Sequence, residues 1–257
     1  MKLNNKTIIA VAIIIILGLV GLIIMIINDK RTTLNIMDED ITKIYNLLGK
    51  ITPEYTNSSC DGLLSYNNEL TTANTLSNAK KLCYAYHNLS TAAFTLNDDK
   101  ETWPTKNELV IADVTTKSIE EANNKIFGPD SKIEHKTDNL SVSPNLKLKL
   151  ENDMYSFKYY NNDQTTSQKE HRVLVNAEQA RKEIHIYDYY IYLEETYKDG
   201  VFSQTCYKDK SKKEVIGECN YGTLKDSYIT EHGGYYKHIF KQHKDGTYYW
   251  YSSEPSN

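Results

Sequence analysis

The sequence predicts an α+β protein with an N-terminal transmembrane helix, two or three short helices and then a mainly antiparallel β-sheet. An apolar run opens the chain, apolar residues recur every three or four positions up to about residue 128, and they alternate with polar residues beyond residue 140. We therefore divide the chain into a cytoplasmic head at 1–7, a transmembrane helix at 8–28, a stem at 29–35 and an exported domain at 36–257, whose helical part covers about 36–128 and whose sheet part covers about 140–257.

The apolar run from Ile8 to Ile27 contains no charged or strongly polar side chain. Twenty helical residues rise about 30 Å, which is the thickness of the hydrocarbon core of a bilayer. The alternative is a cleaved signal peptide, whose apolar region is usually about 7 to 15 residues and ends in a small-residue cleavage site. The run is longer and is followed by no such site, so it predicts a single-pass anchor in the cell membrane.

The cysteines suggest which side of the membrane the domain occupies, because basic residues flank both ends of the run about equally. Cys60, Cys83, Cys206 and Cys219 all follow the run, and an even number of cysteines suits an oxidising compartment. We expect a cytoplasmic N-terminus and an extracytoplasmic C-terminal domain. Three pairings are open, and the local one, Cys60–Cys83 with Cys206–Cys219, is favoured.

Three segments carry helical patterns. Ile41, Ile44, Leu48 and Ile51 form one face of a first helix. A second stripe runs from Leu76 to Leu89. The third segment follows Ser118, which forms a capping box with Glu121, and ends at Gly128-Pro129, a strong stop signal.

Strand patterns dominate the second half. Leu146, Leu148 and Leu150 alternate with lysines, as in a strand with one solvated face. The segment 184–193 is apolar or aromatic on both faces, which predicts a central strand. Two Lys-Asp-Gly sequences, at 198–200 and 244–246, predict hairpin turns. The polar segment 161–171 is expected to be an exposed loop.

Charge and composition exclude some classes of function. The chain carries 30 basic and 34 acidic residues, a net charge of −4, which argues against a nucleic-acid binder. The run from Lys208 to Lys213 is expected to be a solvated hairpin tip, with a basic finger for anionic polymers or lipid headgroups as the alternative.

Enzyme signatures are missing from the sequence. It contains no nucleophile elbow, zinc-protease motif, Walker loop or dinucleotide-binding glycine run. Cys83 and His87 have a spacing that could share a metal ion, but thiols outside the cell oxidise readily. We therefore assign no catalytic residue, cofactor or metal, and we expect a protein that is not an enzyme.

Tyrosine is the most distinctive component, with 21 tyrosines against five phenylalanines. Its large apolar ring and polar tip suit both sheet surfaces and contacts with peptides or sugars. The candidate binding face comprises Tyr187, Tyr189, Tyr190, Tyr192, Tyr248 and Trp250.

The Lys-, Asn-, Ile- and Tyr-rich composition, the short head, the single apolar run and the hairpin that ends the chain resemble uncharacterised single-pass membrane-anchored exported proteins of AT-rich Gram-positive bacteria. A short helix leading into a curved antiparallel sheet is also similar to domains of the nuclear-transport-factor-2-like type. That second similarity concerns the fold alone, and such folds host many functions.

Three hypotheses about function remain open. The first is a membrane-anchored extracytoplasmic domain that binds a protein, a peptide or an envelope glycan and is held in the bilayer by one helix. The second is an envelope enzyme, which requires a pocket where residues such as His185, Asp188, Glu194 or His238 converge. The third is an architectural subunit of a membrane complex, which should expose a large apolar patch.

Overall fold

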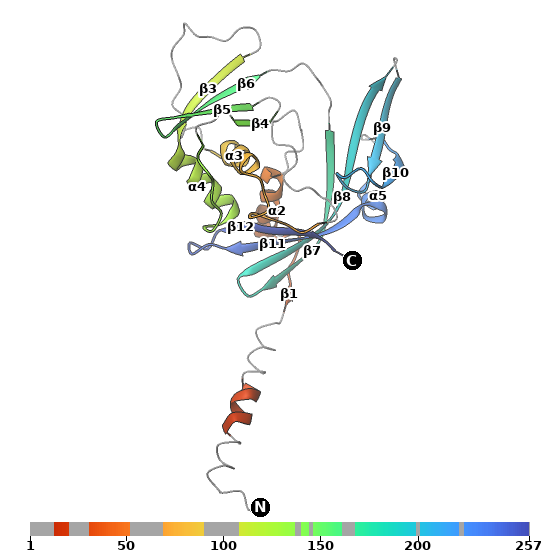
Figure 1. Cartoon of the computed structure of the whole chain (residues 1–257). Helices are drawn as coiled ribbons and strands as arrows, with labels where there is room; N and C mark the ends of the chain where they lie inside the picture. Colours follow the sequence, from red (N-terminus) through yellow and green to blue (C-terminus); the bar gives the residue numbers. More distant parts are fainter. Residues whose placement is uncertain are drawn as a thin grey trace, which may run out of the picture.

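The computed structural model describes residues 13–20, 31–51, 69–89, 108–136, 140–143, 146–160, 168–198, 201–220 and 224–256. Two antiparallel sheets form its β part (Figure 1). The larger sheet contains β1 (Thr32–Thr33), β2 (Thr71–Thr72), β7 (Gln168–Ala180), β8 (Glu183–Lys198), β9 (Val201–Tyr207), β10 (Val215–Glu218), β11 (Gly234–Gln242) and β12 (Tyr248–Pro255). The smaller sheet has the order β3 (Glu108–Thr115), β6 (Met154–Tyr160), β5 (Leu146–Glu151), β4 (Leu140–Ser143).

Strand β8 organises the larger sheet. One of its edges pairs with β7. The other edge pairs with β11 along Glu183–Tyr190 and with β9 along Tyr192–Lys198, so the sheet forks at this point. The prediction of a central strand is confirmed, because β8 has partners on both edges and buries side chains on both faces.

Four helices pack against these sheets: α2 (Glu39–Ile51), α3 (Asn78–His87), α4 (Thr116–Phe127) and α5 (Asp226–His232). Helices α3 and α4 lie between the two sheets, and α5 lies beside β9 and β10 (Figure 1). The α2 stripe is confirmed, since Ile41, Ile44 and Leu48 are all buried. A T-shaped contact of Phe127 with Trp250, at 5.8 Å between ring centroids, joins α4 to β12.

The predicted transmembrane helix at 8–28 is wrong, and the fold class is corrected accordingly. At this end of the chain the described helical turns cover residues 13–20. Within the described ranges, no helix has the length and apolar character needed to cross a membrane. The α+β assignment with a mostly antiparallel sheet is unaffected.

Three local features differ from expectation. Helix α4 begins one turn earlier than its expected capping box, because the Thr115 hydroxyl accepts a 3.1 Å hydrogen bond from the Ser118 amide. Strand β7 begins at Gln168, inside the expected loop 161–171. The first half of the chain is not purely helical, because β3 enters the smaller sheet between α3 and α4.

The cysteine prediction is confirmed for one pair. Cys206 and Cys219 form a disulfide with a Cα–Cα distance of 5.8 Å. Cys83 is also disulfide-bonded. Cys60, its expected partner, lies outside the described residues.

Candidate functional site

A cavity of about 660 Å³ opens between α2, the C-terminal end of α4 and the β11–β12 turn. This volume falls within the range of small-molecule and cofactor sites, about 300–1,000 Å³. Its aliphatic lining comprises Leu34, Ile41, Ile44, Leu47, Ile126 and Ile184. Its uncharged polar lining comprises Asn35, Asn88, Gln179 and Thr247, and Tyr248 stands at its edge.

The local sequence explains why the cavity wall is apolar. Ile41 and Ile44 are one turn apart on α2, so both side chains point toward the sheet. Ile184 supports them from the inward face of β8, and all three residues are buried. Leu34 and Leu47 are half-buried and give the cavity an apolar surface that solvent can reach.

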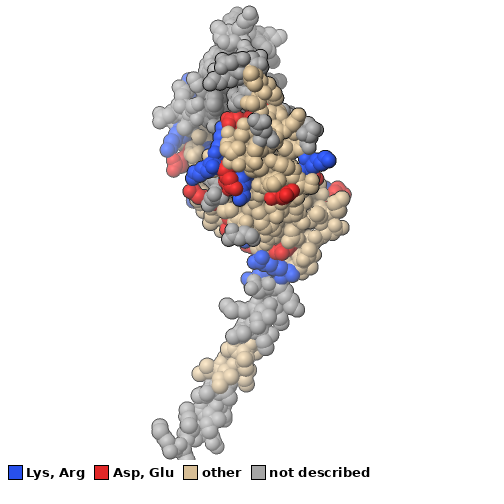
Figure 2. All heavy atoms as spheres, turned by 90° about the vertical axis from the view of Figure 1, so that its right-hand side faces the viewer, with Lys and Arg blue, Asp and Glu red and all other residues tan. Residues whose placement is uncertain are grey.

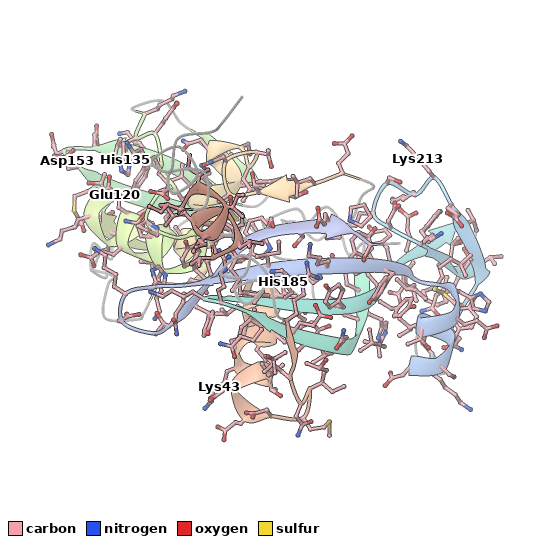
Figure 3. All side chains as sticks on the ribbon, turned by 90° about the horizontal axis from the view of Figure 1, so that it is seen from below. Lys43, Glu120, His135, Asp153, His185 and Lys213 are labelled. Atoms are coloured by element: carbon pink, nitrogen blue, oxygen red, sulfur yellow. A yellow bond between two sulfur atoms is a disulfide. The ribbon has the colours of Figure 1, made fainter. Side chains whose placement is uncertain are left out.

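The charged residues at the cavity are Asp38, Asp40, Lys43 and Lys125, two of each sign. Lys43, labelled in Figure 3, forms ion pairs at 2.8 Å with Glu39 and at 3.6 Å with Asp40. The hydrogen bond to Glu39, and then the charge of Glu39, raise the pKa of Lys43. The rim is therefore balanced in charge and has no strong preference for an anion or a cation.

The β11–β12 turn closes one end of the cavity. Asp245 accepts hydrogen bonds from the Thr247 hydroxyl at 2.6 Å and from its amide at 2.9 Å, and these bonds lower the pKa of Asp245. Gly246 adopts a positive φ of 91°. The predicted Lys-Asp-Gly turn thus holds Tyr248 beside the cavity, where burial raises the pKa of its phenol.

A buried hydrogen-bond chain lies under α2 on the inward face of the sheet. Trp250 Nε1 donates to Ser253 Oγ at 2.8 Å, and Ser253 Oγ lies 2.6 Å from His238 Nδ1. His238 Nε2 lies 2.9 Å from Asp188 Oδ1, and Tyr45 on α2 donates to Asp188 Oδ2 at 3.1 Å. Asp188 and His238 have no exposed surface.

The contact with Asp188 indicates which nitrogen of His238 faces the carboxylate as a donor. A carboxylate accepts only, so Nε2 carries the proton that points to Asp188. A serine, a histidine and an aspartate are thus aligned, but no member is open to solvent. We interpret the chain as a core network that ties α2 to the sheet.

A second histidine lies in a more exposed group. His135 Nδ1 is 2.8 Å from the hydroxyl of buried Tyr155, and its Nε2 is 3.0 Å from Glu120 Oε1 (Figure 3). Burial, and then the charge of Glu120, raise the pKa of Tyr155 to about 12. The phenol is therefore protonated at neutral pH and anchors β6 against the segment after α4.

The structure separates the six residues of the expected aromatic face. Tyr190, Tyr192 and Trp250 point inward and are at most 3% exposed. Tyr187 and Tyr189 lie on the opposite, outer face of β8, where both rings contact Tyr235, at 5.9 and 4.8 Å between centroids. Tyr248 alone of the six lines the cavity.

The four residues named for an envelope enzyme are also separated. Asp188 and His238 meet in the buried chain. His185 points to the outer face, 3.2 Å from Glu183, and Glu194 bonds to Lys212 near the β9–β10 turn. Sequence reasoning missed Tyr45 and Ser253. The contact of Tyr45 with Asp188 spans more than 140 positions of the chain.

The lysine-rich run after β9 is neutralised by neighbouring carboxylates. Lys208 lies 3.3 Å from Glu214 and Lys212 lies 2.5 Å from Glu194, while Lys210 contacts Glu170. Figure 2 shows basic side chains beside acidic ones on this side of the molecule. These pairs argue against a basic finger, because each of the three lysines already has a carboxylate partner.

Comparisons with protein-family models, curated proteins and solved structures find no match for this chain. The similarity to exported proteins of Gram-positive bacteria and to the nuclear-transport-factor-2-like fold therefore stays a prediction.

Proposed function

We propose that this chain is an extracytoplasmic binding domain whose cavity beside α2 takes an uncharged, largely apolar ligand. The cavity carries the proposal, because it joins a volume of about 660 Å³ to an aliphatic wall and a few polar groups. The Cys206–Cys219 disulfide supports a location outside the cytoplasm.

The lining also favours one kind of ligand chemistry. A ligand chain would lie against Leu34, Leu47 and Tyr248, where apolar surface is accessible. Amide and hydroxyl groups at the rim, from Asn35 and Thr247 among others, would bond an alcohol, ester or amide head. A charged head would gain little, because Lys43 already has two carboxylate partners.

A fluorescence titration tests the proposal. The probe is N-phenyl-1-naphthylamine, an uncharged dye that emits strongly in apolar sites, and the competitors are alkyl compounds of equal length that end in alcohol, carboxylate or ammonium. We expect saturable binding and stronger displacement by the alcohol than by either charged compound. Absence of saturable binding, or equal displacement by all three, would contradict the proposal.

Matched variants assign the binding to this cavity. Leu47→Glu places a charge on the accessible wall, and we expect the affinity for the dye to fall at least about tenfold, or about 1.4 kcal/mol. Met37→Glu is the control, because Met37 is 83% exposed and does not line the cavity. Both variants are first checked for unchanged circular dichroism. Equal affinity in the two variants would place the dye elsewhere.

A further inference from the structure

Glu170 on β7 is a buried acidic residue in contact with the largely buried amine of Lys210. Its side chain is 2% exposed, and its Oε1 contacts Nζ of Lys210, whose side chain is 14% exposed. Charged groups are almost never buried to this extent unless they are well paired. The pair joins β7 to the turn after β9, on the inward face of the sheet.

The contact lacks the hydrogen bonds that a buried ion pair needs. Neither carboxylate oxygen of Glu170 accepts a hydrogen bond from any residue that the structure describes. The desolvation of two charges is offset only when geometry is good and the remaining lone pairs are satisfied. The neighbouring pair Lys212–Glu194 is different, because it has a 2.5 Å hydrogen bond and side chains that are 38% and 28% exposed.

The fold holds these two groups together. Glu170, Tyr192 and Tyr207 are in register across β7, β8 and β9. A turn after Tyr207, in which the Ser211 amide donates to Asp209 Oδ1 at 2.7 Å, directs Lys210 back over this row toward Glu170. Tyr192 is 3% exposed and the Glu170 side chain 2%, so the carboxylate end of the contact lies away from water.

We propose that Lys210 and Glu170 are joined by an isopeptide bond between Nζ and Cδ. The unprotonated amine attacks the carbon of the protonated carboxyl group, and these reactive forms differ from the ion pair by transfer of one proton within it. The N–C bond forms, one carboxyl C–O bond breaks, and one water molecule leaves, so no oxidant or other reactant is required.

Two physical effects favour this product. Holding both groups in contact gives an effective concentration far above that of free solutes, up to about 10⁵–10⁸ M for ideal alignment. The product is a neutral amide, so the cost of burying two charges disappears. The bond would close a covalent ring through β7, β8 and β9, the strands at the fork of the larger sheet.

Mass spectrometry of the purified full chain, with its disulfides reduced, tests the bond. We expect an intact mass lower than the sequence mass by one water molecule, and a branched tryptic peptide pair in which Glu170 is joined to Lys210. Glu170→Ala and Lys210→Arg should each show the full mass of their own sequence. Lys212→Arg is the control and should keep the deficit of one water.

Two results would overturn the proposal. One is the full sequence mass in the protein without substitutions, which would mean that Glu170 and Lys210 form an ordinary ion pair. The other is a deficit that maps to a different residue pair or persists in both Glu170→Ala and Lys210→Arg. The intact mass of the unmodified chain decides the first point even if a variant fails to fold.

Discussion

Replacing Asp188 by asparagine tests the buried hydrogen-bond chain under α2. The carboxylate accepts from His238 Nε2 at 2.9 Å and, on its other oxygen, from the Tyr45 hydroxyl at 3.1 Å. Asparagine has nearly the same shape but offers one oxygen and one NH₂ group. The NH₂ group must then face the Tyr45 hydroxyl or His238, so one of these partners has to accept instead of donate, and both bonds lose their charged acceptor in a site without exposed surface.

The structure sets the size of the expected effect. A hydrogen bond to a charged group contributes about 1.5–3 kcal/mol, and a buried donor left without an acceptor costs about 1–3 kcal/mol. These effects are not fully additive, because both donors share one carboxylate. We expect Asp188→Asn to lower the free energy of unfolding by about 3 kcal/mol, or Tm by about 6–12 °C for a chain of this size.

Urea denaturation of the unmodified protein, Asp188→Asn, Tyr45→Phe and the double variant measures this cost. Because Tyr45 and His238 share one carboxylate, the double variant should be more stable than the sum of the two single losses predicts. Asp153→Asn is the control, since Asp153 is exposed, and its effect should lie within about 0.5 kcal/mol. A loss below about 1 kcal/mol, or strict additivity with Tyr45→Phe, would refute the network as drawn.

Two further perturbations follow from other parts of the fold. Gly128→Ala should destabilise the protein strongly, because Gly128 has a φ of 84° and an added Cβ would lie 2.3 Å from the Tyr249 ring. Gly246→Ala is the control and should cost only about 1 kcal/mol, because Gly246 has a similar φ of 91° but open space around it. Equal losses of Tm in the two variants would contradict the close approach of Tyr249. Stability should fall as the pH rises from about 10 to about 12, since the pKa of Tyr155 is raised to about 12 and only the unfolded chain releases this proton at the lower pH. In Tyr155→Phe, the free energy of unfolding measured by urea denaturation should fall less steeply between these pH values. An unchanged slope would mean that other tyrosines cause the loss of stability.

Local patterns predicted much of the fold correctly. The α2 stripe, the Gly128 stop, strand β5 and the Lys-Asp-Gly turn at 244–246 depend on residues close in the sequence. Their period or turn chemistry therefore shows in the sequence itself. The Cys206–Cys219 pair belongs to the same class, because only 13 positions separate its members.

The transmembrane helix shows where a local pattern misled. A long apolar run meets the composition requirement for a membrane helix, but no helix among the described residues has the length and apolar character needed to cross a membrane. Hydropathy measures the preference of side chains for an apolar medium, and it does not measure the length of continuous helix. The prediction for the start of β7 was wrong in the opposite sense, because a polar segment expected to be a loop is a strand. Pairing with β8, rather than its own composition, holds this segment in the sheet.

The candidate sites were decided by tertiary structure. The sequence determined that β8 would be aromatic on both faces, but alternation alone does not say which face meets α2. Packing placed Tyr190 and Tyr192 in the core and left Tyr248 at the cavity. The cavity, the Tyr45–Asp188 bond and the Glu170–Lys210 contact all join residues from distant parts of the chain. Such contacts depend on the register of β7, β8 and β11 and on the position of α2 against the sheet. Both are fixed only when the whole sheet assembles.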